Sequence, residues 1–130
     1  AQHSLMVSDL CPDEYRLWGL LHDASEAYLG DVSTPLKSLL PEYAEIEGRV
    51  QRIIAGRFGL PWPIPKEVKV ADREALMVEK RDLFDVHREW IGEFLPGKDM
   101  SVKVVMSPSL AKFVFQERLS QLTGGPDGQR

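Results

Sequence analysis

One stretch, residues 17–31, restricts the possible folds of this chain more than any other. It begins with apolar residues and continues with ionisable ones. Its apolar part, residues 17–21, leads directly into His22 and Asp23. In a helix His22 and Glu26 would share one face, with Asp23 about 100° around the axis from His22. Carboxylates are rarely buried unless they are paired or bind a metal. We therefore expect a metal ion or a substrate to meet these side chains at a buried surface.

Apolar residues elsewhere recur three and four positions apart, a spacing that predicts α-helices. Prolines and glycines, such as Pro12, Gly30 and Gly59, mark where the helices should begin or end. We expect helices at 3–10, 12–29, 41–58, 66–90 and 108–122, with a short helical piece before Pro41. Residues 102–106 could form a short strand or an extended segment. The sequence thus predicts an all-α fold, a single bundle of five to six helices.

Chain length and composition restrict the class of protein. A chain of 130 residues suits one domain, which we place at residues 1–122 with a flexible tail at 123–130. The net charge of −4 argues against a nucleic acid polymer as partner, although a small anionic substrate remains compatible with it. Cys11 is the single cysteine, so no internal disulfide can form and a cytoplasmic location is expected. No apolar run approaches the roughly 18 residues of a membrane span, so no membrane partner is expected.

Other ionisable residues can complete a set of metal ligands around His22 and Asp23. His3 lies on the first expected helix, and Asp72 stands among small and apolar residues early in the helix at 66–90. Two imidazoles and two carboxylates from three helices would suit a divalent transition metal. A metal held in this way lowers the pKa of bound water and supplies hydroxide at neutral pH.

Each residue of this set also has a simpler interpretation. His22 and Asp23 alone could be a structural hydrogen-bonded pair, and His3 could be a solvated residue near the chain start. Asp72 could cap the N-terminus of its helix. The run of alternating charges at residues 79–82 indicates a solvated or subunit-facing surface.

The complete pattern resembles the HD-domain metal-dependent phosphohydrolases, in which histidines and a His-Asp pair recur on a helical frame. Residues 22–37 are similar to the bacterial and phage branch that contains the 5′-deoxynucleotidases and small dNTP phosphohydrolases. Residues 2–5 resemble the start of that family's first motif, and residues 71–72 resemble its last motif. The resemblance covers residues 1–83, about two thirds of the chain. It implies hydrolysis of a small nucleotide, a deoxynucleoside 5′-mono- or triphosphate.

The resemblance also implies roles for individual residues. One divalent transition metal (Mn, Co, Ni, Fe or Zn) would be bound by four residues: His3, His22, Asp23 and Asp72. Glu26 matches the catalytic acid that orients the attacking water or handles its proton.

The resemblance further implies a set of substrate contacts. Asp31 matches a residue that reads the sugar, although a turn residue after Gly30 is an equal alternative. Lys37 and Lys69 match phosphate-contacting positions, and either could instead be an ordinary solvated lysine. The lysine charges would help to offset those of a polyanionic substrate.

Two departures from the resembled nucleotidases concern the start of the chain. The interval between His3 and His22 is shorter, although Cys11 and Pro12 allow a tight turn between helices. The nucleotidases also carry a helix before the first histidine that helps to bind the nucleotide. Here either that upstream helix is missing, or the base and phosphate contacts come from elsewhere.

The sequence is also compatible with two other functions, and it predicts an oligomeric state. The chain could be a phosphodiesterase acting on cyclic dinucleotides or alarmones. It could also be a catalytically silent, metal-binding HD module with a regulatory role. The amphipathic segment 41–58 and the residues beyond Gly92 offer more apolar surface than a small core needs, so we expect a homodimer or a higher homo-oligomer.

Overall fold

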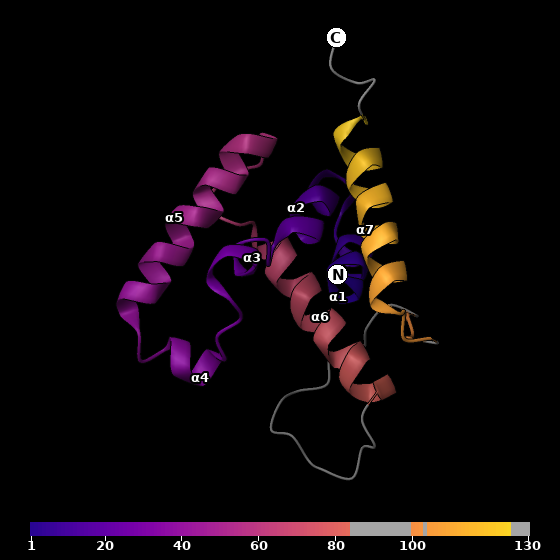
Figure 1. The fold of residues 1–130 in the computed structure, drawn as a ribbon, viewed down its shortest axis with the longest axis horizontal. Helices are drawn as coiled ribbons and strands as arrows, with labels where there is room; N and C mark the ends of the chain where they lie inside the picture. Colours follow the sequence, from indigo (N-terminus) through magenta and orange to yellow (C-terminus); the bar gives the residue numbers. More distant parts are fainter. Residues whose placement is uncertain (84–99, 103, 126–130) are drawn as a thin grey trace.

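The computed structural model describes residues 1–83, 100–102 and 104–125, and in them the only regular structure is helical (Figure 1). The helices are α1 (Gln2–Leu10), the 3₁₀ turn η1 (Asp13–Tyr15), α2 (Arg16–Leu21), α3 (Glu26–Leu29), α4 (Thr34–Lys37), α5 (Pro41–Phe58), α6 (Lys66–Leu83) and α7 (Pro108–Thr123). The helices α3 and α4 are single turns of four residues. Five longer helices therefore carry the described fold, and the all-α prediction is confirmed.

Most predicted helix boundaries agree with the structure. The helix α5 begins and ends as predicted, because Gly59 takes the left-handed conformation (φ 64°) that stops it. The helix α7 extends one residue beyond its predicted end. The helix α6 begins at Lys66 as predicted, and residues 84–90 of that prediction lie outside the described residues. The described residues at 102–106 form no strand.

The continuous helix predicted for residues 12–29 is wrong, because the chain turns at residues 22–25 between α2 and α3. Ala24 donates its backbone N–H to the carbonyl of Leu21 three residues back (2.9 Å), instead of four residues back. The His22 ring donates from Nδ1 to the carbonyl of Gly19 at 2.7 Å. We attribute the break to this side-chain bond, which competes for a carbonyl that the helix would otherwise use.

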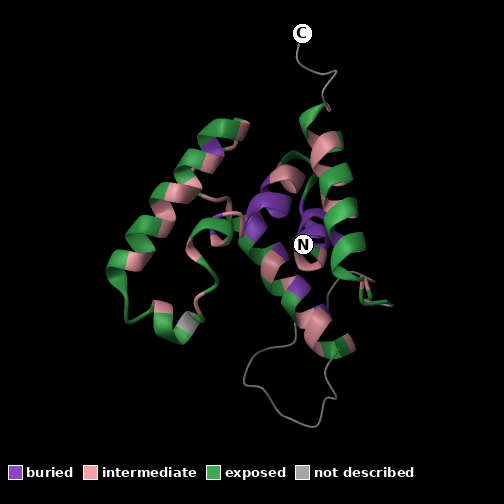
Figure 2. Ribbon diagram, viewed as in Figure 1, coloured by how far each residue is buried: buried purple, intermediate pink, exposed green. Residues whose placement is uncertain are grey.

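The buried core lies where α1, α2 and α6 pack together, shown by the purple segments of Figure 2. Trp18 of α2 is 0% exposed and donates its indole N–H to the carbonyl of Pro61 at 2.7 Å. Its ring centroid lies 6.5 Å from that of Trp62. Trp18 thereby ties the connection between α5 and α6 to the core.

A glycine allows α1 and α2 to approach closely. A Cβ atom on Gly19 would lie 2.8 Å from Sγ of Cys11, 3.0 Å from Cα of Ser8 and 3.0 Å from the carbonyl oxygen of Val7. Backbone atoms cannot move aside cheaply, so any larger residue would push the two helices apart. Because Gly19 also accepts the hydrogen bond from His22, the close packing fixes the position of that ring.

The remaining long helices are attached less closely. Asp9 of α1 forms ion pairs with Arg16 of α2 and with Arg118 of α7. The second pair holds α7 beside α1. The helix α5 stands apart from the core in Figure 1 and contributes only Ala55 to the buried residues. No described helix is both long and apolar enough to cross a membrane.

Candidate metal centre and adjoining cleft

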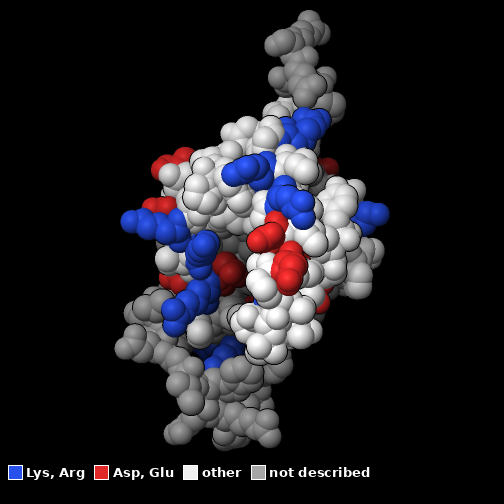
Figure 3. All heavy atoms as spheres, turned by 90° about the vertical axis from the view of Figure 1, so that its left-hand side faces the viewer, with Lys and Arg blue, Asp and Glu red and all other residues white. Residues whose placement is uncertain are grey.

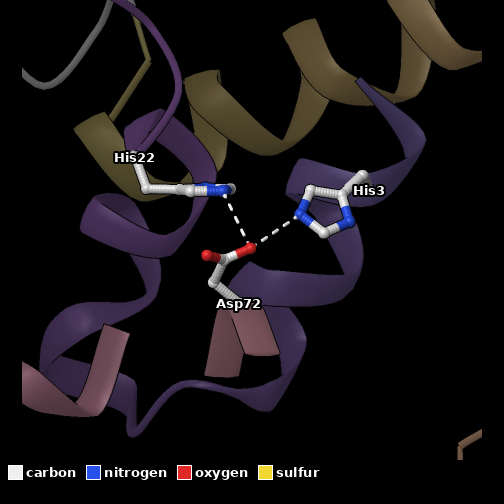
Figure 4. A group of neighbouring side chains, drawn as sticks. All are labelled: His3, His22 and Asp72. Atoms are coloured by element: carbon white, nitrogen blue, oxygen red, sulfur yellow. Dashed lines mark hydrogen bonds and ion pairs between the residues drawn. The ribbon is translucent and has the colours of Figure 1, made fainter. Parts of the chain in front are cut away.

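Three predicted metal ligands from distant parts of the chain meet in the structure. His3 comes from α1, His22 from the turn after α2, and Asp72 from α6 (Figure 4). One ligand atom from each lies within 4.8 Å of the other two. Nε2 of His3 is 3.0 Å from Oδ1 of Asp72, and Nε2 of His22 is 3.6 Å from the same oxygen. The two rings therefore direct the same kind of nitrogen at one carboxylate oxygen.

These separations suit a shared metal ion. Ligand atoms that each lie about 2.1 Å from a transition metal are about 3.0 to 3.5 Å apart in common geometries. Nε2 of His22 is buried and has no hydrogen-bond partner among the described residues, although two carboxylates lie near it. These contacts are ion pairs only while the ring is charged, and a metal ion would satisfy the buried nitrogen of the neutral ring. The donor set therefore fits a divalent transition metal.

The tautomer of His22 follows from its surroundings. A backbone carbonyl can only accept, so the bond to Gly19 places the proton of the neutral ring on Nδ1. Nε2 then carries the lone pair that a metal requires. The ring is 7% exposed and cannot easily turn away.

Asp23, the fourth predicted ligand, lies beside the group. Its Oδ2 is 3.0 Å from Nε2 of His22, but it is not part of the three-residue group that converges within 4.8 Å. Ligation by His3, His22 and Asp72 is compatible with the observed geometry. Ligation by Asp23 stays a prediction.

The sequence did not reveal that Glu79 belongs to this site. Its Oε2 accepts a hydrogen bond from Nδ1 of His3 at 2.9 Å, so Glu79 faces this site, whereas residues 79–82 were predicted to form a solvated or subunit-facing surface. Glu79 is seven residues after Asp72, two turns along α6, which places both carboxylates on one face. This spacing was the signal that could have identified it.

The carboxylates and rings change each other's proton affinities. Burial opposes the charged form of His22, but Asp23 and Asp72 outweigh this effect and raise its pKa from 6.5 to about 10. Asp72 makes the largest contribution to the raised pKa of His3. Burial lowers this pKa, and Glu79 raises it further. Hydrogen bonds from the two rings lower the pKa of Asp72 below its usual value, and His22 makes the larger contribution. A metal would therefore displace protons when it binds.

A cleft of about 610 Å³ opens beside the metal ligands. Glu26, the predicted catalytic acid, lines it together with His3 and Asp23. Burial, followed by the charges of Asp23 and Asp31, raises the pKa of Glu26. Residues of α7 also line the cleft, Lys112 and Phe115 among them. The cleft therefore places the candidate proton-transfer group Glu26 in one open space with His3 of the converging group and with Asp23.

The predicted substrate contacts lie farther out. Lys37 forms an ion pair with Glu47 of α5 at 2.7 Å, and its ammonium lies 5.7 Å from the centroid of the Tyr43 ring. Asp31 is exposed, and Lys69 is exposed one turn before Asp72 on α6. None of the three belongs to the converging group or lines the cleft. Their substrate-binding roles stay predictions.

Two further features of the site were not found in the sequence. Glu47, the partner of Lys37, lies ten residues away on another helix, and no spacing rule connects the two. The contribution of Lys112 and Phe115 to the cleft depends on how α7 docks.

Figure 3 shows the face that α5 presents, where Lys and Arg side chains gather along one edge of a hollow that contains an acidic side chain.

The fold and the site together define an all-α protein with a His/Asp group that could hold a metal ion. The chain is 38% identical to the uncharacterized protein YfdR of Escherichia coli (strain K12) over 125 residues, 95% of this chain and 70% of the relative. The chain therefore belongs to the family of YfdR. It is also 38% identical to the uncharacterized protein RCAP_rcc00048 of Rhodobacter capsulatus over 89 residues, 62% of this chain and 45% of that protein. No family model and no solved structure matches the chain.

Proposed function

We propose that this protein is a metal-dependent phosphohydrolase of the HD type that acts on small nucleotides, deoxynucleoside 5′-mono- or triphosphates. One observation carries the proposal. Nε2 of two histidines and Oδ1 of Asp72 converge, and the buried Nε2 of His22 has no hydrogen-bond partner in the described part of the chain. The resemblance of residues 22–37 to nucleotidases supplies the reaction class.

His3, His22 and Asp72 would hold the metal, with Asp23 as an expected fourth ligand. Such a metal, when bound, acidifies water and polarises a phosphoryl oxygen. Gly19 keeps the proton of His22 on Nδ1 and so leaves Nε2 available. Asp72 and Asp23 supply negative charge that offsets part of the cation's charge.

Glu26 would position the attacking water and accept or return its proton. It lines the same cleft as His3 and Asp23, so a water in that cleft could reach these two side chains and the Glu26 carboxylate. A carboxyl group whose pKa is raised exchanges protons more readily near neutral pH than an ordinary one. The cleft of about 610 Å³ is within the roughly 300–1,000 Å³ of small-molecule sites.

Lys37 would contact the phosphate after exchanging its partner. Its ammonium is held by Glu47 at 2.7 Å, so a phosphate must compete with this carboxylate. Glu47 is the main cause of the raised pKa of Lys37, and the charge of Glu26 adds a smaller contribution in the same direction. Lys69 and Asp31 complete the proposed substrate contacts, Asp31 through the sugar.

The proposal is tested by measuring phosphate release after loading the protein with Mn²⁺, Co²⁺ or Ni²⁺. The substrates are deoxynucleoside mono- and triphosphates, with cyclic dinucleotides and an alarmone as alternatives. We expect metal-dependent release from the deoxynucleotides. Metal binding without release from any of these substrates would instead support the silent regulatory module.

Glu26→Gln separates catalysis from metal binding. Loss of a general acid or base lowers kcat by roughly 10²- to 10⁴-fold, and the metal should still bind with its full stoichiometry. Glu42→Gln, an exposed carboxylate on α5, is the matched control and should leave kcat unchanged. Unchanged turnover in Glu26→Gln with metal bound would contradict the catalytic role.

A phosphodiesterase acting on cyclic dinucleotides or alarmones is the alternative enzyme. The same metal ligands and Glu26 would serve it, because both reactions direct water at phosphorus. Preferential cleavage of these substrates in the same screen would replace the nucleotidase proposal. The two cases therefore differ in the preferred substrate and not in the metal centre.

We further propose a cytoplasmic homodimer or higher homo-oligomer. Ile46 and Ile53 of α5 are 40% and 71% exposed, which leaves apolar surface for a second copy. Size-exclusion chromatography with light scattering measures the mass directly. A mass near 14.7 kDa would identify a monomer and contradict the proposal.

A further inference from the structure

We propose that Glu79 is a positioning residue that holds His3 as a metal ligand and sets the metal affinity of the site. The inference rests on the metal centre of the proposed function, and it holds whichever phosphoester is the substrate. Glu79 is not one of the converging ligands, and it acts on the metal only through the His3 ring.

The two nitrogens of His3 face different carboxylates. Nδ1 lies 2.9 Å from Oε2 of Glu79, and Nε2 lies 3.0 Å from Oδ1 of Asp72, the oxygen shared with His22. When a metal occupies Nε2, the ring must keep its proton on Nδ1. Glu79 is a carboxylate placed to accept that proton in a hydrogen bond. The ring is thereby held in the tautomer and orientation that a metal ligand needs.

The second histidine shows the same arrangement with a different acceptor. His22 donates from Nδ1 to the carbonyl of Gly19 at 2.7 Å and directs Nε2 at Asp72. Both rings therefore have a fixed Nδ1 and converging Nε2 atoms. The acceptor is neutral for His22 and charged for His3. A charged acceptor makes the ring a stronger donor to a metal, so Glu79 affects affinity as well as orientation.

His3 has greater need of such support than His22. Its side chain is 25% exposed and lies in the first turn of α1, whereas that of His22 is 7% exposed. Asp72 and Glu79 are two turns apart on one face of α6. One rigid helix therefore provides both a ligand and the group that orients the neighbouring ligand.

A purely structural ion pair is the alternative. His3 between two carboxylates could simply join α1 to α6, and Glu79 would then contribute to folding alone. In that case its removal lowers the thermal stability of the metal-free protein and leaves metal affinity unchanged. The two roles therefore differ in which measurement responds.

The experiment compares Glu79→Gln and Glu79→Ala with the matched control Glu74→Gln in the full 130-residue chain. Glu74 lies on the same helix, two residues after Asp72 and so on the opposite face, and it makes no hydrogen bond or ion pair within the described part of the chain. Zn²⁺ and Co²⁺ dissociation constants are measured by competition with a chelator. We expect Glu79→Ala to weaken binding about 10- to 100-fold. Glu79→Gln can still accept the Nδ1 proton, so we expect a smaller loss.

Spectra of the loaded proteins report on the ring itself. In the Zn²⁺-loaded protein, long-range ¹H–¹⁵N correlations should show His3 protonated on Nδ1, with a slowly exchanging proton. In Glu79→Ala that proton should exchange rapidly, and the visible absorption of the Co²⁺ form should change. The same signals of His22 should be unaltered in both variants.

Each outcome supports or overturns the proposal. Dissociation constants of Glu79→Gln and Glu79→Ala both within twofold of the parent value would overturn it. If Glu79→Ala does not fold, the test depends on Glu79→Gln. Weaker metal binding by Glu79→Gln with an unchanged melting temperature would support the proposal, and unchanged metal binding would overturn it. If the parent protein binds metal but hydrolyses nothing, the proposed function fails while the role of Glu79 stands.

Discussion

The core and the outlying arm of this molecule divide the site between them. The core consists of α1, α2 and α6, and it carries His3, His22 and Asp72 among tightly packed helices. The arm, residues 30–58 with α4 and α5, carries the predicted substrate contacts Asp31 and Lys37 on exposed segments. Figure 2 shows the contrast, because the buried residues gather in the core while α5 is largely exposed or half-buried.

This division indicates what each region can tolerate. Metal ligands must keep separations of about 3 Å, and only close-packed helices hold side chains that firmly. Lys37, in contrast, already has a partner in Glu47 and can exchange it for a phosphate by a side-chain movement. Under the proposed function, the core would hold the metal and the arm would contribute part of the substrate contacts.

The largest expected effect concerns stability. Trp18→Ala should lower the free energy of unfolding by about 3–5 kcal/mol, because it leaves a large cavity and removes the hydrogen bond to Pro61. Leu39→Ala in the arm, where the side chain is 75% exposed, should change it by less than about 0.5 kcal/mol. Urea unfolding followed by circular dichroism measures both. Equal losses would show that the arm is as integral to the fold as the core.

A second prediction concerns the metal. Asp72→Asn should weaken Mn²⁺ or Zn²⁺ binding by more than about 100-fold, beyond the effect expected of an orienting residue such as Glu79. Asp31→Asn in the arm should leave binding unchanged, because Asp31 is not in the converging group. Calorimetric titration of both variants gives the comparison. Weakened metal binding in Asp31→Asn would extend the metal centre into the arm.

Stability should depend on pH through the core. The folded-state pKa of His22 is raised from 6.5 to about 10, so its stabilising contribution is complete below pH 6.5 and is lost as the pH rises through about 10. Asp72 has a lowered pKa, so its contribution is present above pH 3.8 and is lost as the pH falls. Glu47 raises the pKa of Lys37 above 10.5, so the arm's ion pair persists over the range in which His22 titrates.

The expected outcome is a falling melting temperature of the metal-free protein between pH 6.5 and 10. Metal affinity should rise over the same range, because protonated rings cannot bind the ion. Thermal scans with and without Zn²⁺ at each pH test both trends. A melting temperature independent of pH would contradict the assigned role of the His22 charge.

The smallest expected effects lie in the arm. Lys37→Met should raise KM for a deoxynucleotide roughly 10-fold, the loss of one hydrogen bond to a charged group. Glu47→Gln should lower KM a few-fold, because Lys37 then lacks its charged competitor. Neither change should alter the metal dissociation constant, and Arg52→Met serves as an exposed control on α5. An unchanged KM in both variants would remove Lys37 from the substrate contacts.

Local features of this chain could be predicted well from its sequence. The helix α5 is bounded by Pro41 and Gly59, whose backbone preferences act within a few residues, and both boundaries are correct. The break at His22 could not be predicted, because it depends on a bond from the ring to the Gly19 carbonyl that competes with a good helical pattern. Local propensity cannot decide such a competition.

The sequence by itself determined that the protein is helical, where most of the helices end, and which side chains could bind a metal. Tertiary structure alone decided that His3 meets Asp72 across 69 residues, that Glu79 contacts Nδ1 of His3, and that Lys37 pairs with Glu47. The physical reason is the range of the interactions. Helix boundaries follow from backbone preferences of neighbouring residues, whereas the site depends on how whole helices pack, and small residues such as Gly19 set that packing.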